Sequence, residues 1–228
     1  MLTPFAILYS PGATLARIKS QPEWLTPFLM LAAITVLLYV LTHPFLIEAT
    51  LAHLPASANA GDKRVVAQTL HNELPLRSFF LPVRLLIGWS SFAFTLCMIG
   101  RVFRSAEQLQ FVKVFSLCVH AEMFVLLSKF ATLIGLVLGG NAFLKMPALV
   151  PFSAAHLIST KDSVTFSLLN SINLFTFLYV IVLTIGISVQ SGMSRQKSLF
   201  VAVLAFLGLL LFDAGTVAFL RDILHLEL

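Results

Sequence analysis

Five apolar stretches constrain this chain more than any other feature of its sequence. A transmembrane helix needs about 20 mostly apolar residues to cross the hydrocarbon core of a bilayer. The chain of 228 residues holds five stretches of that kind, at 25–47, 85–103, 111–138, 167–189 and 198–220. The sequence therefore predicts an all-α, polytopic membrane protein with about five transmembrane helices.

The low content of charged residues indicates the same class. Charged residues make up 11% of the chain and hydrophobic residues 58%, whereas average soluble proteins are roughly a quarter charged. Lipid must therefore solvate much of the surface. The net charge of +5 contains no basic run longer than Lys63-Arg64. This pattern favours contacts with the lipid bilayer and topology signals, and no nucleic acid is expected as a partner.

A short helix is predicted before the first span. Ser10 and Pro11 are typical of an N-cap followed by proline at the first helical position. A helix over 11–20 would place Leu15 and Ile18 on one face. We expect this helix to lie on the membrane surface.

The chain divides into an N-terminal amphipathic surface segment, 1–24, and a five-span transmembrane domain, 25–228. Five spans place the two termini on opposite sides of the membrane. Basic residues are dense in the short connections around 101–113 and 195–197. Short basic connections face the cytoplasm, so we expect a cytoplasmic N-terminus and a periplasmic C-terminus.

The connection between the first two spans is the longest. Its residues 61–73 predict a helix with grouped apolar positions, and Pro75 is expected to end that helix. Pro82 and Trp89 then mark the start of the second span.

Several polar residues lie inside the predicted spans, where a charge costs roughly 2.5–3.5 kcal/mol on insertion scales. The third span holds His120, Glu122 and Lys129, the fourth holds Asn173 and the fifth holds Asp213. At about 1.5 Å per residue, Lys129, Asn173 and Asp213 reach one level in the membrane. We predict an ion pair between Lys129 and Asp213, bracketed by Asn173.

Glu122 is the deepest charge without an obvious partner. It lies seven residues before Lys129 and shares its helix face, whereas His120 points the other way. Thr95 and Tyr179 are at similar depths and could donate hydrogen bonds to it. Two interpretations remain open: a proton or ion relay or substrate cavity, and interhelical contacts that fix the order of the helices.

Two further pairs of residues bear on helix packing. Gly135 and Gly139 have the GxxxG spacing that permits close helix approach, within the protomer or with a partner. Cys97 and Cys118 fall at matching depths on neighbouring spans. They lack a CxxC spacing, so we expect small-residue packing and no metal.

Catalytic motifs are missing from the sequence. His120-Ala121-Glu122 imitates the H-x-E of zinc deaminases, but the partner P-C-x-x-C does not occur. HExxH, G-x-S-x-G, Walker A and GxGxxG patterns are also absent. The sequence therefore predicts a protein without enzymatic activity and without a cofactor.

Two stretches carry a family resemblance. The residues around the start of the first span include Tyr9-Ser10-Pro11, Ile18, Pro22, Trp24-Leu25 and Pro27. The third span begins Phe111-Val112-Lys113-Val114-Phe115 and continues with Val119-His120-Ala121. Both stretches resemble bacterial members of the Yip (Ypt-interacting protein) domain family. The chain departs from the family pattern at His120, usually a tyrosine, and at Met123, usually a proline.

The resemblance implies a five-span protein of the bacterial inner membrane. Eukaryotic members act in vesicle trafficking and bind small GTPases, and some bacterial members accompany MacB-like ABC efflux transporters. We therefore expect an accessory or assembly subunit, with an ABC transporter subunit or a second copy as its partner. The alternative is a small transporter or channel that uses the polar residues of the third span. A water-filled cavity reaching Glu122 would favour that alternative.

Overall fold

The computed structural model describes residues 4–52, 54, 59–103, 108–144, 150–157 and 163–224. Side chains are described for these residues except 52, 140–144, 163–164, 167 and 212–224. Throughout the described ranges the regular structure is helical, apart from an isolated bridge between Ser153 and Asn173. The helices are α1 (Ala6–Tyr9), α2 (Pro11–Ser20), α3 (Leu25–Ala52), α4 (Ala60–Val102), α5 (Phe111–Leu144), the 3-10 helix η1 (Ala154–His156), α6 (Ser163–Ser171), α7 (Leu174–Ser191) and α8 (Arg195–Leu224).

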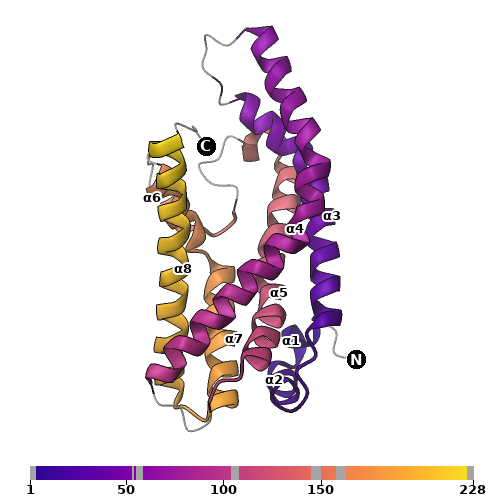
Figure 1. Cartoon of the computed structure of the whole chain (residues 1–228). Coiled ribbons are helices and arrows are strands. Elements are labelled where there is room, and N and C mark those ends of the chain that lie inside the picture. Colours follow the sequence, from indigo (N-terminus) through magenta and orange to yellow (C-terminus); the bar gives the residue numbers. More distant parts are fainter. Residues whose placement is uncertain are drawn as a thin grey trace.

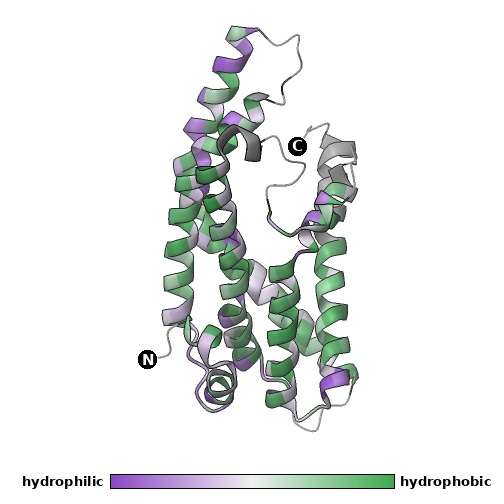
Figure 2. Cartoon of the chain, turned by 180° about the vertical axis from the view of Figure 1, so that it is seen from behind, coloured by the Kyte–Doolittle hydropathy of each residue, from purple (hydrophilic) through white to green (hydrophobic). Residues whose placement is uncertain are grey.

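Four of the described helices, α3, α4, α5 and α7, are long and apolar enough to cross a membrane. The helix α8 is a fifth long helix of 30 residues, but its side chains are described only as far as Leu211. Hydrophobic residues run along the long helices, while hydrophilic residues gather in the first turns of α4 (Figure 2). The chain is therefore an α-helical protein with helices suited to a membrane.

The helix α5 lies inside the bundle and packs against α3, α4 and α7 (Figure 1). Its first half is buried on several faces at once, because Val114, Leu117, Cys118 and Ala121 are all fully shielded. The helix α8 packs against α7 and α4. The helices α4 and α5 therefore connect the two sides of the molecule, since α4 packs against both α3 and α8.

The short helices α1 and α2 lie beneath one end of the bundle, which we call the closed end (Figure 1). The helix α2 packs against α5 and α7. Leu15 and Ile18 share its buried face, with exposed fractions of 1% and 0%. Protein helices therefore cover this face, and the position of α2 on the membrane surface stays a prediction. Ser10 makes no side-chain cap, and its hydroxyl donates instead to the Ala6 carbonyl at 3.2 Å.

The helix α4 corrects the predicted boundary between loop and span. It continues through Pro75 and Pro82 for 43 residues, about 65 Å at the usual rise. A proline removes one backbone hydrogen bond, yet membrane helices tolerate it when their other bonds and neighbours hold. Asn59 and Asp62 start the helix with reciprocal capping hydrogen bonds of 2.9 and 3.0 Å. Its first turns extend beyond the other helices (Figure 1).

The predicted fourth span is interrupted. The chain forms α6, breaks at Ile172 and Asn173, and starts again as α7. Asn173 has an extended backbone, and its side chain accepts a hydrogen bond from the Thr176 amide at 3.0 Å. Asparagine side chains compete for backbone amides in this way, so they favour helix starts over helix interiors. The continuous helix expected over 167–189 is therefore wrong at its N-terminal end.

Candidate functional site

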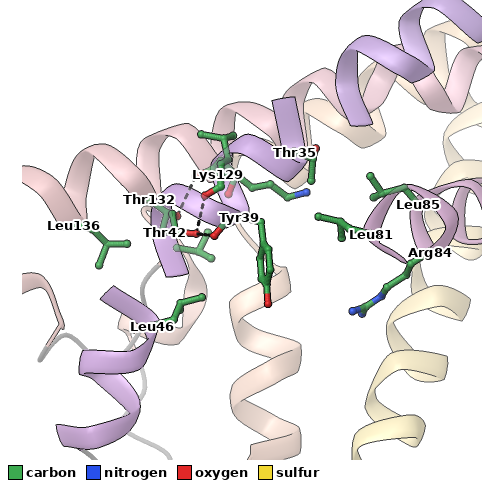
Figure 3. A pocket seen from close by; sticks show the side chains of 13 residues that line it. Thr35, Tyr39, Thr42, Leu46, Leu81, Arg84, Leu85, Lys129, Thr132 and Leu136 are labelled. Carbon is green, nitrogen blue, oxygen red and sulfur yellow. Dashed lines mark hydrogen bonds between the residues drawn. The ribbon is translucent and has the colours of Figure 1, made fainter. Parts of the chain in front are cut away.

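Two neighbouring cavities lie between the helices at the end of the bundle opposite α1 and α2, which we call the open end. The Glu122 cavity has a volume of about 480 Å³ and is lined by residues of α4, α5, α6, α7 and α8. The Tyr39 cavity, of about 540 Å³, is lined by residues of α3, α4 and α5 (Figure 3). Both cavities share a wall made of Arg84, Leu85, Ser128, Lys129 and Val150.

The Glu122 carboxyl lies where three helices meet. Glu122 lines the Glu122 cavity from α5 with an exposed fraction of only 8%. The Trp89 indole of α4 lies close enough to act on it as a hydrogen-bond donor, and the positive charge of Lys129 acts on it electrostatically. Within the described residues, Glu122 makes no ion pair shorter than 4.0 Å. The carboxyl is therefore held by one donor and a more distant charge.

The partners expected for Glu122 are found in part. Tyr179 of α7 lines the same cavity and interacts electrostatically with Glu122. Thr95 does not reach the carboxyl, because its hydroxyl donates to the Ser91 carbonyl of its own helix at 2.9 Å. The sequence did not predict Trp89 as a partner of Glu122, since an aromatic residue at the end of a span is usually interpreted as an interfacial anchor.

Two cations stand in the wall between the cavities. The side chains of Lys129, from α5, and Arg84, from α4, both reach the Tyr39 cavity (Figure 3). Each lies 18 residues along its helix from the connection between Val102 and Phe111, a distance of about 27 Å. Their like charges act on each other. The sequence does not single out Arg84, because this residue precedes the predicted second span. Counting 18 residues back from Val102 along α4 places Arg84 at the same depth as Lys129.

The break between α6 and α7 lies at the same cavity. Asn173 is buried and lines the Glu122 cavity together with Asn170. The Oδ1 atom of Asn170 is buried and has no hydrogen-bond partner among the described residues. The first turn of α7 also reaches the cavity through Thr176, and the N-terminal end of a helix carries partial positive charge. The structure thus gathers Glu122, Lys129 and Asn173 around one space.

The proposed partner of Lys129 cannot be placed in the same way. Asp213 belongs to α8, but its side chain lies outside the described residues. The predicted ion pair between Lys129 and Asp213 therefore stays a prediction.

His120 belongs to a different part of the molecule. It is fully buried and lines neither cavity. Its Nδ1 atom lies 2.8 Å from the Ser116 carbonyl oxygen, and its Nε2 atom has no partner in the described part of the chain. The Ser116 hydroxyl in turn donates to the Glu23 carbonyl at 3.0 Å, next to the closed end. His120 is thus separated from the cavity residues.

The predicted packing residues are also distributed differently. Gly135 is half-buried and Gly139 is exposed, so their role in helix contact stays a prediction. Cys97 and Cys118 are buried free thiols. Among the described residues, no three His, Cys, Asp or Glu side chains are grouped so that they could hold a metal ion.

Comparisons with protein-family models, with curated proteins and with solved structures give no significant match to this chain.

Proposed function

We propose that this protein is a small membrane transporter whose solute path includes the Glu122 cavity. The observation that carries this proposal is a cavity of about 480 Å³ that reaches a buried carboxyl. A closed, dry bundle would have argued against transport, since a path needs space between the helices. We expect no enzymatic activity and no cofactor.

The surroundings of the cavity support the same proposal. Buried charges in membrane proteins commonly mark solute or proton pathways. The helix interruption at Asn173 lies at the cavity wall, and interrupted helices are common at transporter binding sites. Irregular backbone at membrane depth is tolerated where protein buries it or where it lines a cavity.

The proposed topology has five spans, with α8 as the fifth. The N-terminus and the closed end would face the cytoplasm, and the open end would face the periplasm of a bacterial inner membrane. The basic residues near the closed end favour this orientation, because short positive connections remain on the cytoplasmic side. Solute would then enter the Glu122 cavity from the periplasmic side.

A cysteine accessibility experiment tests whether water reaches the cavity. Cys97→Ala and Cys118→Ala first remove the native thiols. Val125→Cys then places a thiol in the Glu122 cavity, and a charged methanethiosulfonate reagent is added to membranes. Thiolates form in water and not in hydrocarbon, so we expect rapid modification at position 125.

The matched control is Ile87→Cys. Ile87 of α4 is 62% exposed and lines neither cavity. It lies about 22 Å from the Val102 end of its helix, close to the depth of Val125. Modification of Val125→Cys as slow as that of Ile87→Cys would mean a dry cavity and would sink the transport proposal.

A second proposal is that the protein is an accessory or assembly subunit of a larger complex. The observation in its favour is an apolar groove of about 330 Å³ between α7 and α8, which could receive a partner helix. The Yip-like resemblance suggests a MacB-like ABC efflux transporter as that complex. Affinity purification in mild detergent, followed by mass spectrometry, tests this proposal. A stoichiometric transporter subunit would support it, whereas a lone protein or a homo-oligomer would exclude a stable complex with another protein.

A further inference from the structure

The Tyr39 cavity differs from the Glu122 cavity in the chemistry of its lining. Five leucines contribute its apolar part, from α3, α4 and α5. Its ionisable lining groups are Arg84, Lys129 and the Tyr39 phenol, and no carboxylate lines it among the described residues. A cavity of about 540 Å³ falls within the range of roughly 300–1,000 Å³ typical of small-molecule sites. Its composition suits a molecule with an apolar part and a negative group.

The charges of the side chains around the shared wall also favour binding of an anion. Arg84 and Lys129 repel each other, and among the described side chains Glu122 is an opposite charge that acts on Lys129. Glu122 lines the other cavity. Among the described side chains, two cations and one carboxylate leave an excess positive charge at this level. The predicted pairing of Asp213 with Lys129 would still leave the Arg84 charge to attract an anion. An oxyanion in the Tyr39 cavity would relieve the repulsion and accept hydrogen bonds from both cations.

The remaining polar groups define the donors available to such an anion. The Thr42 and Thr132 hydroxyls donate to carbonyls of their own helices, at 2.8 Å and 3.0 Å, so they are already used. The Tyr39 ring packs edge-on against His43, and its hydroxyl points into the space that Arg84 enters (Figure 3). The Thr35 and Ser128 hydroxyls also line the cavity. The donors available to an anion are therefore the guanidinium, the ammonium, the phenol and these two hydroxyls.

The depth of the cations identifies the source of the anion. Arg84 and Lys129 lie about 27 Å from the closed end of their helices, against a hydrocarbon core of about 30 Å. Their backbones therefore lie a few ångströms inside the far edge of the core, and their long side chains can extend to the lipid head groups there. Basic groups at this level attract anionic head groups.

We propose that the Tyr39 cavity binds an anionic lipid. Arg84, Lys129 and Tyr39 hold its phosphate, and the leucines of α3, α4 and α5 contact part of an acyl chain. This proposal goes beyond the transport function, because it concerns the other cavity and does not require solute movement.

Native mass spectrometry of the delipidated protein in mild detergent tests the proposal. The probes are lysophosphatidylglycerol, lysophosphatidylcholine with the same chain, and glycerol phosphate as a head group without a chain. We expect one bound lysophosphatidylglycerol, held about tenfold or more tightly than lysophosphatidylcholine, because its net negative charge is not offset by a choline group. Glycerol phosphate should bind weakly, since it cannot contact the leucines.

Two charge variants and one control locate the site. Arg84→Gln and Lys129→Gln should each weaken lysophosphatidylglycerol binding about tenfold or more, the loss expected for hydrogen bonds to a charged group. Arg64→Gln removes the same charge from an exposed position on the same helix, and we expect unchanged binding.

A pair of shape variants tests the cavity without removing charge. Leu81 lines the Tyr39 cavity, so Leu81→Trp should fill it and abolish the bound adduct. Ile87→Trp, on an exposed face of α4, should leave the adduct unchanged.

Three outcomes would overturn the lipid site. Equal binding of the two lysolipids would remove the anion requirement. Equal binding in Arg84→Gln and Arg64→Gln would show that Arg84 merely reaches the water interface. Binding of glycerol phosphate as tight as that of lysophosphatidylglycerol would assign the cavity to a free anion. Failure of the cysteine accessibility experiment would leave this site standing, because a lipid does not require a water-filled Glu122 cavity.

Discussion

At the closed end of the bundle, α5 and α7 lie in direct contact next to the short helices, whereas at the open end the same two helices line a cavity. The two helices approach closely at Gly186 of α7, where an added Cβ would lie 2.6 Å from Cδ2 and 3.0 Å from Cγ of Leu117. A few turns further along α5, Glu122 and Lys129 face cavities. One helix thus serves as tightly packed core in its first half and as cavity wall in its second.

The difference shows how a small membrane protein can hold open space. Dense packing at the closed end fixes the directions of the helices. The helices at the open end therefore stay ordered without packing tightly against each other. The polar side chains at the open end then line the cavities. The free energy that it costs to bury them in the membrane is offset by dense packing at the closed end. Substitutions that disrupt the packing at the closed end should therefore unfold the protein. Substitutions at the open end should mainly alter what the cavities bind.

The largest effect is expected at the α5–α7 contact. Gly186→Val places a branched side chain against Leu117, and overpacking should cost about 3 kcal/mol of stability. Unfolding in mixed detergent measures the loss. Gly208→Val is the control, because no atom lies within 4 Å of a Cβ added there. Addition of Leu117→Ala should recover part of the loss; if it does not, the two residues are not in contact.

The next effect tests the docking of α2 at the closed end. Ile18→Ala removes a fully buried side chain and should cost about 2 kcal/mol through the cavity it leaves. Tyr9→Ala, at a residue that is 75% exposed, should leave the thermal midpoint nearly unchanged. If both variants unfold at the wild-type temperature, α2 rests in lipid and does not pack on the bundle.

A smaller effect is expected at the interrupted helix. Asn173→Ala removes the N-cap of α7 and should lower the stability by about 1 kcal/mol. Asn72→Ala, at an exposed position of α4, is the comparison. Equal thermal midpoints for the two variants would mean that the Asn173 side chain does not hold the start of α7.

The smallest effect on stability is expected at Glu122. Glu122→Gln keeps an oxygen that can accept from the Trp89 indole, so the protein should fold with a nearly unchanged thermal midpoint. If Glu122 is the proton relay of the functional interpretation, wild-type proteoliposomes should show proton flux, followed with an internal pH dye under a potassium diffusion potential. That flux should fall to the level of empty liposomes in Glu122→Gln.

Lys129→Ala provides the contrast to this variant. It removes the charge that acts on Glu122 and, if the predicted pair exists, the partner of Asp213. A buried charge left without its partner is costly, so Lys129→Ala should lower the amount of folded protein more than Glu122→Gln does. Equal loss of folded protein in the two variants would argue against a functional role for Glu122.

Sequence patterns predicted the extent of the helices better than their interruptions. The start of α5 at Phe111 falls where the apolar stretch begins, because hydropathy along the chain is a local property. The boundaries failed at Pro75 and at Asn173. A proline ends a helix or lies within it depending on neighbouring contacts, and an asparagine breaks a span only where its side chain finds a backbone amide.

The sequence by itself determined that this chain is a membrane-embedded helical protein with costly polar residues in its third span. Those properties follow from composition and from helix periodicity, and both are local. Only the tertiary structure decided that Arg84 faces the same space as Lys129, that Trp89 lies close to Glu122, and that His120 lies apart from them. Such relations depend on how each helix is rotated and packed against the others. Contacts between distant parts of the chain determine that packing.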